Sequence, residues 1–276
     1  MLIAVDTGGT KTLVASFNRD GVLGEQIKFP TPSDSEEYTK ILKALLKETY
    51  GKEHIDAVVV GCPGIIKDGV VLWAGGNLKW KNFDIAKALR GVLGNAPVLV
   101  ENDANLAGLA ETRMLKKIPN QSLYVTISTG IGTGITTDGH INPCLRNSEA
   151  GHALIEYDGI VREWEKFASG RAIYETYNKY ARDITSKRTW YQIADRISRG
   201  FLAVIPILQP DIIIIGGSIG THFDKYSVQL EKILKEKLPG LIPCPKFVQA
   251  KYPELAVIYG CYYYALDNIS HIAIKK

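Results

Sequence analysis

The segment LIAVDTGGTKTLVASFNRDGVL, residues 2–23, contains an apolar strand, a glycine-threonine turn and a second, half-alternating strand. An Asp-Gly turn follows at residues 20–21, and this order of signals is typical of a β-hairpin. Residues 123–141 repeat the plan as LYVTIS, TGIGTG and ITT, followed by Asp-Gly at 138–139. The letters match weakly, but the order of the elements is the same. The chain is therefore predicted to contain two related halves.

Strands and helices alternate along the rest of the chain. A third glycine turn follows a fully apolar strand in DIIIIGGSIG, residues 211–220. Apolar residues at helical spacing predict helices over 36–50, 104–117 and 191–207. Further strands are expected at 56–60, 70–74, 97–100, 123–128, 134–137 and 211–215. This alternation predicts an α/β protein, in which a ligand between the halves would lie at the strand ends, beside the glycine turns.

Glycine-threonine turns can hold phosphate, because glycine lets backbone N–H groups approach an anion and threonine adds hydroxyl donors. The alternative is a tight hairpin that needs glycine only for a positive φ angle, and for a single turn this alternative is favoured. Two other phosphate motifs are excluded. Thr10 stands where a P-loop requires glycine, and the glycines at 130, 132 and 134 lead into a strand, whereas the dinucleotide motif leads into a helix.

Polar residues end another buried-looking strand in VENDANLAGLAE, residues 100–111. Asn102 or Asp103 would cap a helix that begins at Ala104, by accepting hydrogen bonds from its unpaired N–H groups. The same carboxylates and amides would also suit a catalytic site. These residues alone do not separate the two roles.

Composition restricts the classes of function. The chain has 276 residues, 46% of them hydrophobic, and a net charge of +4 without a block of lysine or arginine, so a nucleic-acid partner is not expected. No apolar run approaches the ~20 residues that a membrane-spanning helix needs. Met1 leads directly into a strand, which leaves no room for a signal peptide. Four scattered cysteines favour reduced thiols, and these features together predict a cytoplasmic protein.

A series of short motifs runs along almost the whole chain: DTGGTKT at 6–12, GCPG at 61–64, NLKW at 77–80, ENDAN at 101–105, STGIGTG at 128–134, EAGH at 149–152, GGS at 216–218 and IYGC at 258–261. In this order they resemble ROK-family sugar kinases of the actin-like ATPase superfamily. The resemblance implies a two-lobed actin-like ATPase (ribonuclease H-like) α/β fold with a cleft between the lobes. An N-terminal lobe would span 1–111, joined by a C-terminal helix at 256–276, and a second lobe with a helical insertion would span 112–255.

The resemblance also implies a function, the ATP-dependent phosphorylation of glucose or a close relative at its 6-hydroxyl. Asp103 would be the general base that takes the hydroxyl proton. The sugar would be held by Asn77, Asn102, Asp103, Glu149, His152 and Glu165. Donor phosphates would be bound by Gly8, Gly9, Thr10, Lys11, Thr12, Thr129, Gly130, Gly132 and Thr133, with Asp6 near Mg²⁺ through water. Gly216, Gly217 and Ser218 would lie against the adenosine end of ATP.

The chemistry of phosphoryl transfer agrees with these roles, because the protein mainly positions the reactants and stabilises charge on the moving phosphoryl group. Opposed donor-rich turns and a metal ion would supply that stabilisation. Asp103 needs no raised pKa for its role, since an ionised carboxylate can take the proton late in a loose transition state.

The chain departs from the family after the EAGH motif. Most members carry a zinc site there, made of one histidine and the three cysteines of the pattern CxCGxxGCxE. The segment EYDGIVREWE, residues 156–165, has no cysteine, and Glu156, Asp158 and Glu163 occupy the cysteine positions. Three carboxylates with one imidazole suit a hard cation or solvent better than a structural zinc. We therefore expect no zinc and a His152 that contacts the sugar without metal support, a core or hinge histidine being the alternative.

Several other functions stay open. Other acceptors within the same chemistry are N-acetylmannosamine, N-acetylglucosamine, mannose and fructose, and polyphosphate is an alternative donor. The altered residues 140–165 also leave open a sugar-binding protein without turnover. ROK repressors carry a helix-turn-helix segment before the first strand, and this chain begins at that strand, so a repressor is disfavoured. Relatives are often dimers, and the helical region 166–207 is a candidate homodimer surface.

Overall fold

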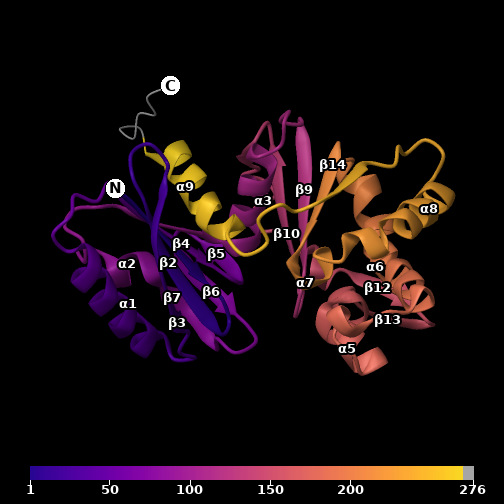
Figure 1. The fold of residues 1–276 in the computed structure, drawn as a ribbon, viewed down its shortest axis with the longest axis horizontal. Helices are drawn as coiled ribbons and strands as arrows, with labels where there is room; N and C mark the ends of the chain where they lie inside the picture. Colours follow the sequence, from indigo (N-terminus) through magenta and orange to yellow (C-terminus); the bar gives the residue numbers. More distant parts are fainter. Residues whose placement is uncertain (270–276) are drawn as a thin grey trace. The chain divides into compact units, whose positions relative to one another are not determined.

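The computed structural model describes residues 1–269, which form two compact units (Figure 1). Unit 1 contains Met1–Ala110 and residues 255–269, and unit 2 contains Glu111–Glu254. Both units combine sheets with helices, which confirms the predicted α/β class. Within the described residues, no helix has the length and apolar character needed to cross a membrane.

The main sheet of unit 1 has the strand order β3-β2-β1-β4-β8. Its strands are β1 (Leu2–Thr7), β2 (Lys11–Phe17), β3 (Leu23–Pro30), β4 (Ala57–Cys62) and β8 (Val98–Asn102). β1 pairs antiparallel with β2 in the predicted hairpin and parallel with β4, which pairs parallel with β8. Parallel strands are covered by helices on both faces, which explains the nearly unbroken apolar runs of β1 and β4.

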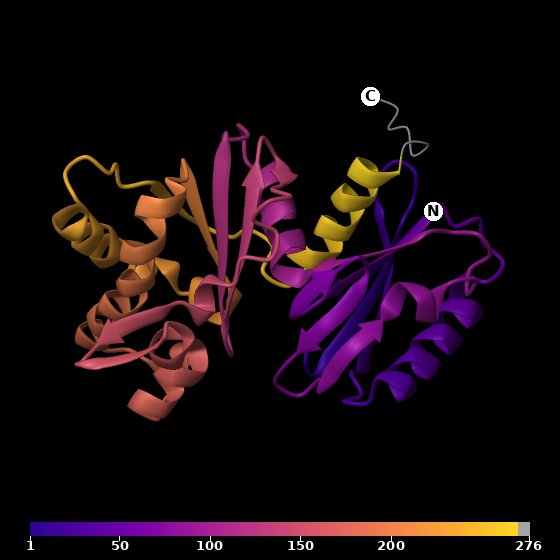
Figure 2. The same ribbon diagram turned by 180° about the vertical axis from the view of Figure 1, so that it is seen from behind.

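Helices cover both faces of this sheet (Figures 1 and 2). α1 (Ser35–Tyr50) and the short α2 (Ile85–Leu89) share one hydrophobic core with β1, β4 and β8. α9 (Ala256–Asn268) shares another core with the opposite face of the same strands. A second, three-stranded sheet is made of β5 (Ile65–Lys67), β6 (Val70–Ala74) and β7 (Trp80–Asp84). The apolar face that helical periodicity predicted for residues 36–50 is therefore the face of α1 that packs on the sheet.

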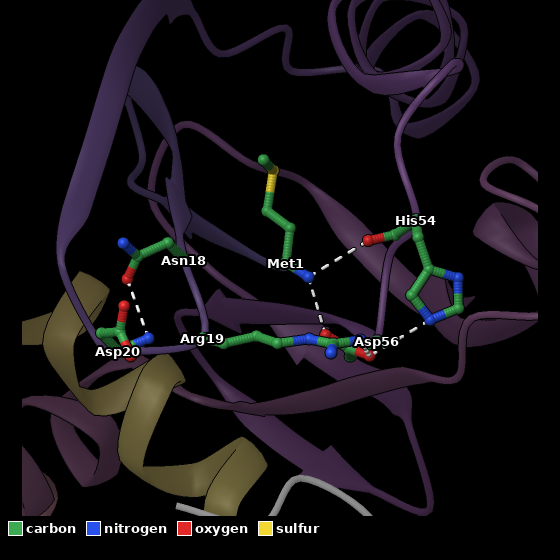
Figure 3. Close-up of polar contacts among 6 residues, drawn as sticks. All are labelled: Met1, Asn18, Arg19, Asp20, His54 and Asp56. Carbon is green, nitrogen blue, oxygen red and sulfur yellow. Dashed lines mark hydrogen bonds and ion pairs between the residues drawn. The ribbon is translucent and has the colours of Figure 1, made fainter. Parts of the chain in front are cut away.

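The N-terminus of unit 1 is fixed by an ion pair (Figure 3). The Met1 ammonium donates to the Asp56 carboxylate at 2.7 Å and to the carbonyl of His54 at 3.1 Å. Arg19 and the His54 ring lie 3.8 Å and 3.3 Å from the other carboxylate oxygen. Burial alone would raise the pKa of Asp56, but the hydrogen bond and charge of Met1, with Arg19 and His54, lower that pKa below its usual value. β1 is thus anchored through the residue that precedes it.

The main sheet of unit 2 has the strand order β11-β10-β9-β14-β15. Its strands are β9 (Gln121–Ile127), β10 (Ile131–Thr137), β11 (His140–Ile141), β14 (Ile212–Gly216) and β15 (Lys246–Gln249). β9 pairs antiparallel with β10 and parallel with β14, and β14 pairs parallel with β15. This order repeats that of unit 1 position for position, which confirms the prediction of two related halves.

Two long helices, α6 (Lys187–Leu208) and α8 (Ser227–Lys237), share the hydrophobic core of unit 2 with β9 and β14. The segments between the main strands form short elements. These are η1 (Ala150–His152), β12 (Leu154–Tyr157), β13 (Ile160–Glu163), α4 (Glu165–Ala168), α5 (Gly170–Tyr177), η2 (Ala181–Asp183), α7 (Gly217–Gly220) and η3 (Phe223–Lys225). They carry four of the ten residues of unit 2 that the sequence marked as functional, namely His152, Glu165, Gly217 and Ser218.

Several predicted boundaries were wrong. α3 (Asp103–Arg113) ends before residue 117, because the Leu115 N–H turns back to the Thr112 carbonyl and Arg113 donates to the carbonyl of Gly139. α6 begins before residue 191, because Ser186 caps it. β10 includes residues 131–133, since Ile131, Gly132 and Thr133 pair with β9 and do not form a loop. The predicted C-terminal helix at 256–276 ends at Asn268, and residues 270–276 lie outside the described residues.

Candidate functional site

Two carboxylates lie at the carboxyl end of the unit 1 sheet. Asp6 in β1 pairs in register with Gly61 of β4, and Gly61 pairs with Glu101 of β8. Asp103 begins α3 directly after β8. Only β4 separates the two strands, so the backbones of Asp6 and Asp103 are on the order of 10 Å apart. Both residues are half-buried, so their side chains are still accessible to a ligand.

Both carboxyl groups have a raised pKa. Burial raises the pKa of Asp103 to about 6, although the hydrogen bond from the N–H of Ala104 acts in the opposite direction. Burial, and then the negative charge of Asp103, raise the pKa of Asp6 to about 7. A carboxylate with a pKa near neutrality is well matched to general-base catalysis. Two such carboxylates at one edge also form a favourable environment for a hard divalent cation.

The predicted helix cap at Asn102 and Asp103 is confirmed. The Asn102 Oδ1 accepts hydrogen bonds from the N–H groups of Ala104 and Asn105 at 2.9 Å and 3.1 Å, and Asp103 accepts from Ala104 at 2.9 Å. The Asn102 Nδ2 donates to the carbonyl of Gly64 at 3.0 Å. This bond uses one of the two Nδ2 hydrogens. Capping therefore involves Asn102 Oδ1 and one oxygen of Asp103, and a general base needs only one of its two carboxylate oxygens.

Glu101 supports this segment, a role that was not predicted from the sequence. Its side chain is fully buried, and Oε1 accepts hydrogen bonds from the backbone of Asn102 at 2.9 Å and from the side chain of Asn105 at 3.0 Å. A carboxylate at the end of an apolar strand was the available signal. Glu101 fixes the peptide that precedes Asp103.

The turn between β1 and β2 contains Gly8 and Gly9, and neither has a positive φ angle. The interpretation that glycine serves this turn only through a positive φ is therefore wrong. A Cβ atom placed on Gly9 would meet no other atom within 4 Å. Thr10 and Lys11 are exposed beside it, whereas the buried Thr12 hydroxyl shares a hydrogen bond with Thr31 at 2.8 Å. Thr12 thus stabilises the turn, and Gly9 leaves open space beside it.

The predicted sugar contact Asn77 lies elsewhere in unit 1. It is exposed in the loop between β6 and β7. The end of this loop is fixed by buried Trp80, whose Nε1 donates to the carbonyl of Ser33 at 2.9 Å.

A cavity of about 480 Å³ lies within unit 2, beside the β9–β10 turn, α5, η2 and α7. It is lined by Ser128, Thr129, Gly170, Arg171, Tyr174, Tyr180, Ala181, Arg182, Ser218, Ile219, Thr221 and His222. The structure thus brings the predicted nucleotide contacts Thr129 and Ser218 to one cavity, although they are far apart in the sequence.

The aromatic wall of this cavity was missed in the sequence. The rings of Tyr174 and Tyr180 lie 4.6 Å apart, and the Arg182 guanidinium lies 4.9 Å from the centre of the Tyr180 ring. The concentration of tyrosine and arginine over residues 171–182 was the available signal. Aromatic faces beside arginine suit a planar, negatively charged ligand.

Backbone conformation and close packing explain why glycine occurs at several positions around this cavity. Gly217 has a φ of 76°, and a Cβ atom on it would lie 2.5 Å from the carbonyl oxygen of Ile127. A Cβ on Gly170 would lie 2.7 Å from the Ser128 carbonyl oxygen, and one on Gly216 would meet Tyr124 at 2.3 Å. These glycines allow the backbone of the cavity walls to approach closely.

Thr133 of the β9–β10 hairpin supports the loop before η1. The buried Thr133 hydroxyl donates to the carbonyl of Ser148 at 3.0 Å and accepts from the N–H of Ala150 at 3.3 Å. These bonds hold the half-buried Glu149 between them. Gly132 pairs with Thr126 inside the sheet. Thr133 therefore positions Glu149, and its phosphate contact stays a prediction.

The predicted sugar contacts His152 and Glu165 lie close together, with Glu163 between them. One donor atom from each of the three side chains lies within 4.8 Å of the others. The Lys166 ammonium lies 2.9 Å from Glu165 and 3.3 Å from Glu163. A zinc ion would compete with this ammonium for the same oxygens, and the cluster offers no thiolate. These residues therefore do not fit a structural zinc site.

The aligned carboxylates Glu156 and Asp158 belong to a different feature. They lie in the β12–β13 hairpin, where Glu156 accepts a hydrogen bond from the N–H of Gly159 at 2.6 Å and Asp158 has a φ of 54°. They serve the tight turn, so only Glu163 of the three carboxylates aligned with the family's cysteines joins His152.

Comparison with known proteins identifies the family. The family model described as ROK family matches residues 2–268. A polyphosphate glucokinase of Mycobacterium tuberculosis (strain CDC 1551 / Oshkosh) is 28% identical over 233 residues, which cover 82% of this chain and 81% of that protein. An N-acetylmannosamine kinase of Escherichia coli (strain SE11) is 32% identical over 186 residues, which cover 62% of each protein.

A solved structure agrees with these matches. The inorganic polyphosphate/ATP-glucomannokinase of Arthrobacter sp. strain KM is 29% identical, with a TM-score of 0.73 over 97% of this chain and 98% of that one. The fold is therefore the two-lobed actin-like ATPase fold that the resemblance implied. With a family match that runs almost from end to end, the chain belongs to the ROK family.

Proposed function

We propose that this ROK-family protein transfers the terminal phosphoryl group of ATP to the 6-hydroxyl of a hexose, glucose or a close relative, with Asp103 as general base. The observation that carries this proposal is the half-buried Asp103 carboxylate, whose pKa is raised to about 6 and whose backbone is fixed by the cap of α3. Similarity to kinases that are named for glucose, mannose or N-acetylmannosamine supports a sugar as acceptor.

In this reaction the sugar oxygen attacks the terminal phosphorus, and the bond from that phosphorus to the bridging oxygen of ADP breaks. The hydroxyl proton passes to the Asp103 carboxylate, which later releases it to solvent. Asn77, Asn102, Glu149, His152 and Glu165 would hold the other hydroxyl groups. The protein's main contribution is the alignment of acceptor and donor, because the transition state is loose.

The donor phosphates would bind at the two glycine turns. The open space beside Gly9 supports this role, because neither packing nor backbone conformation requires glycine there. Asp6 would hold Mg²⁺, through water. Burial and the charge of Asp103 raise the pKa of Asp6, because the negative charge of its carboxylate is not compensated. A divalent cation bound there would offset this charge, which supports the role. Mg²⁺ would neutralise charge on the phosphates of the donor.

The tyrosine-lined cavity favours ATP over polyphosphate as donor. A nucleobase can stack on Tyr174 or Tyr180, and Arg182 can bind a phosphate. A polyphosphate chain has no ring that could stack on these tyrosines. Ser218 and Gly217 would lie against the adenosine. An ATP-dependent enzyme of this kind would act in the cytoplasm, where ATP is supplied.

The two predicted lobes, 1–111 with the C-terminal helix and 112–255, would have complementary tasks. Unit 1 would supply the base and the metal ligand, and unit 2 would supply the nucleotide cavity and further sugar contacts. Phosphoryl transfer requires both sets of residues to act on one pair of substrates. A decrease in the radius of gyration on adding sugar, measured by solution scattering, is the expected sign of domain closure.

A coupled assay with a panel of acceptors and donors tests the proposal. ATP should support phosphorylation of glucose or of one among mannose, fructose, N-acetylglucosamine and N-acetylmannosamine. Tyr180→Ala should raise the KM for ATP by about tenfold, the scale of one lost stacking contact, and leave the KM for polyphosphate unchanged. Tyr191→Ala, an exposed tyrosine of α6 outside the cavity, is the matched control. Binding of a sugar without its phosphorylation would favour the non-enzymatic alternative.

A further inference from the structure

A chain of charged side chains in unit 2 joins His152 to Glu165. The Nδ1 atom of His152 lies 3.3 Å from one oxygen of Glu163, and the Lys166 ammonium lies 3.3 Å from the other. The same ammonium lies 2.9 Å from Glu165, whose second oxygen accepts from the N–H of Ile131 at 3.4 Å. Lys166 is therefore the group that links the two carboxylates.

The hairpin glycine before Ile131 fits this arrangement. A Cβ atom on Gly130 would lie only 2.7 Å from the Glu165 Oε2 atom. Glycine at this position thus leaves room for the carboxylate, which is held against the start of β10 from one side and by Lys166 from the other. The position of Glu165 is determined by both contacts.

The charges of the cluster depend on Lys166. Its hydrogen bond to Glu163 is the main cause that lowers the pKa of that carboxyl, with a smaller contribution from His152. The hydrogen bond to Glu165 is the main cause that raises the pKa of Lys166. Two carboxylates this close repel each other when nothing positive lies between them. One ammonium between them removes that repulsion and gives both a common partner.

A structural metal would have the same two effects, because it neutralises its ligands and ties separate segments together. Here the joined segments are η1, the end of β13 and the start of α4. The donor set does not fit zinc, as shown above, and the ammonium already contacts two of the three donors. The cluster therefore contains its own cation.

We propose that Lys166 is a positioning residue that replaces the family's structural metal, holding Glu165 directly and His152 through Glu163. This inference rests on the proposed function, in which His152 and Glu165 contact the sugar. When Glu163 accepts from the Nδ1–H of His152, the neutral ring has its proton on Nδ1, and Nε2 can accept a hydrogen bond from a sugar hydroxyl. Lys166 itself does not touch the substrates.

Kinetics of three variants test this role. Lys166→Met keeps the length of the side chain and removes its charge, and it should raise the KM for the sugar by about tenfold, the scale for loss of a supporting contact. The KM for ATP should stay near that of the wild type. Lys166→Arg should restore most of the sugar affinity. Lys235→Met is the matched control, because Lys235 also forms an ion pair, with Glu231 at 3.3 Å, but on α8.

A second measurement does not depend on activity. The ring nitrogens of His152, assigned by comparison with His152→Gln, should report an Nδ1–H tautomer in the wild type and a tautomer mixture in Lys166→Met. Metal analysis of wild-type protein purified without chelator should find far less than one zinc per chain. An unchanged ring spectrum with an unchanged sugar KM in Lys166→Met, or stoichiometric zinc in the wild type, would overturn the inference. If no sugar is phosphorylated, the proposed function fails, and the ring spectrum still decides the role of Lys166.

Discussion

Replacement of Asp103 by asparagine separates the proposed chemistry of this residue from its structural role. Asparagine has nearly the same shape, and its Oδ1 can accept the hydrogen bond from the Ala104 N–H that Asp103 accepts at 2.9 Å. The two hydrogen bonds that Asn102 Oδ1 accepts from the N–H groups of Ala104 and Asn105 do not involve residue 103. The start of α3 should therefore keep its conformation in Asp103→Asn.

The expected kinetic effect is large. An amide cannot accept the hydroxyl proton, so kcat should fall by ~10²-fold or more, the usual scale for loss of a general base. Sugar binding should change much less, because the amide still offers an oxygen acceptor and gains donors. The predicted signature is a loss of kcat with a nearly unchanged dissociation constant for the sugar.

The expected effect on stability has the opposite sign. Burial raises the pKa of Asp103 to about 6 in the folded protein. When the pKa of a carboxyl group is higher in the folded than in the unfolded protein, its contribution to stability is fully present below the unfolded pKa. This contribution is lost as pH rises through the folded pKa, which is about 6 for Asp103. At neutral pH the charged side chain therefore destabilises the ligand-free protein. With a discount for partial exposure, the cost is about 1–2 kcal/mol, so Asp103→Asn should be at least as stable as the wild type.

The assay compares three proteins by coupled kinetics, sugar binding by calorimetry and urea unfolding. Asp84→Asn is the matched control, because Asp84 also accepts a helix-capping hydrogen bond, from the N–H of Lys87 at 2.8 Å, but lies outside the proposed site. It should retain the wild-type kcat. Turnover of Asp103→Asn within a fewfold of the wild type would remove Asp103 from the role of base. Lost turnover with lost stability would indicate that the residue mainly supports the fold.

Three further predictions concern the rest of unit 1. Since the pKa values of Asp103 and Asp6 are raised to about 6 and about 7, kcat/KM should fall as pH decreases through this range, and a flat profile would contradict their roles. Gly9→Ala should raise the KM for ATP by about tenfold through contact with the donor, while Gly240→Ala, which also has open space around it, should leave KM unchanged; equal KM values in both would remove the phosphate role of that turn. An N-terminal extension that displaces the Met1 ammonium should lower the free energy of unfolding in urea by about 1 kcal/mol, because its partner Asp56 loses an ion pair. Asp56 has a lowered pKa, so this stability is present above the unfolded pKa of a carboxyl group and is lost as pH falls through the folded value; equal stability at pH 7 would show that the pair contributes nothing.

The sequence predicted the parts of the fold that depend on local patterns. Apolar runs and glycine turns located both hairpins, and their repetition predicted the related sheets that the strand orders confirm. The cap of α3 followed from the chemistry of Asn102 and Asp103 alone. Such features need only neighbouring residues, because strand pairing across a tight turn and helix capping are short-range interactions.

Features that depend on distant contacts could not be predicted in the same way. The aromatic cavity joins residues from α5, η2 and α7, whose proximity is set by packing in unit 2. Thr12 and Thr133 are correct residue types for phosphate binding, yet their hydroxyls bond Thr31 and the loop before η1. A motif identifies a hydroxyl donor, but the tertiary structure determines which acceptor it meets.

Three glycines show how one residue type serves different physical needs within similar motifs. Gly217 has a positive φ and a carbonyl oxygen against its Cα, so its reason is conformation and backbone packing. Gly130 has an ordinary φ and leaves room for the Glu165 carboxylate, so its reason is a side chain of the same protein. Gly9 has neither a positive φ nor a neighbour within 4 Å. Alanine there would cost the folded chain nothing and would reduce the entropy of the unfolded chain, so stability alone favours alanine. Gly240 also has neither a positive φ nor a neighbour within 4 Å, so these two properties alone do not identify a ligand site. In the proposed chemistry a phosphate donor binds at the turn of Gly9, and an effect of Gly9→Ala but not of Gly240→Ala on the KM for ATP would separate the two glycines.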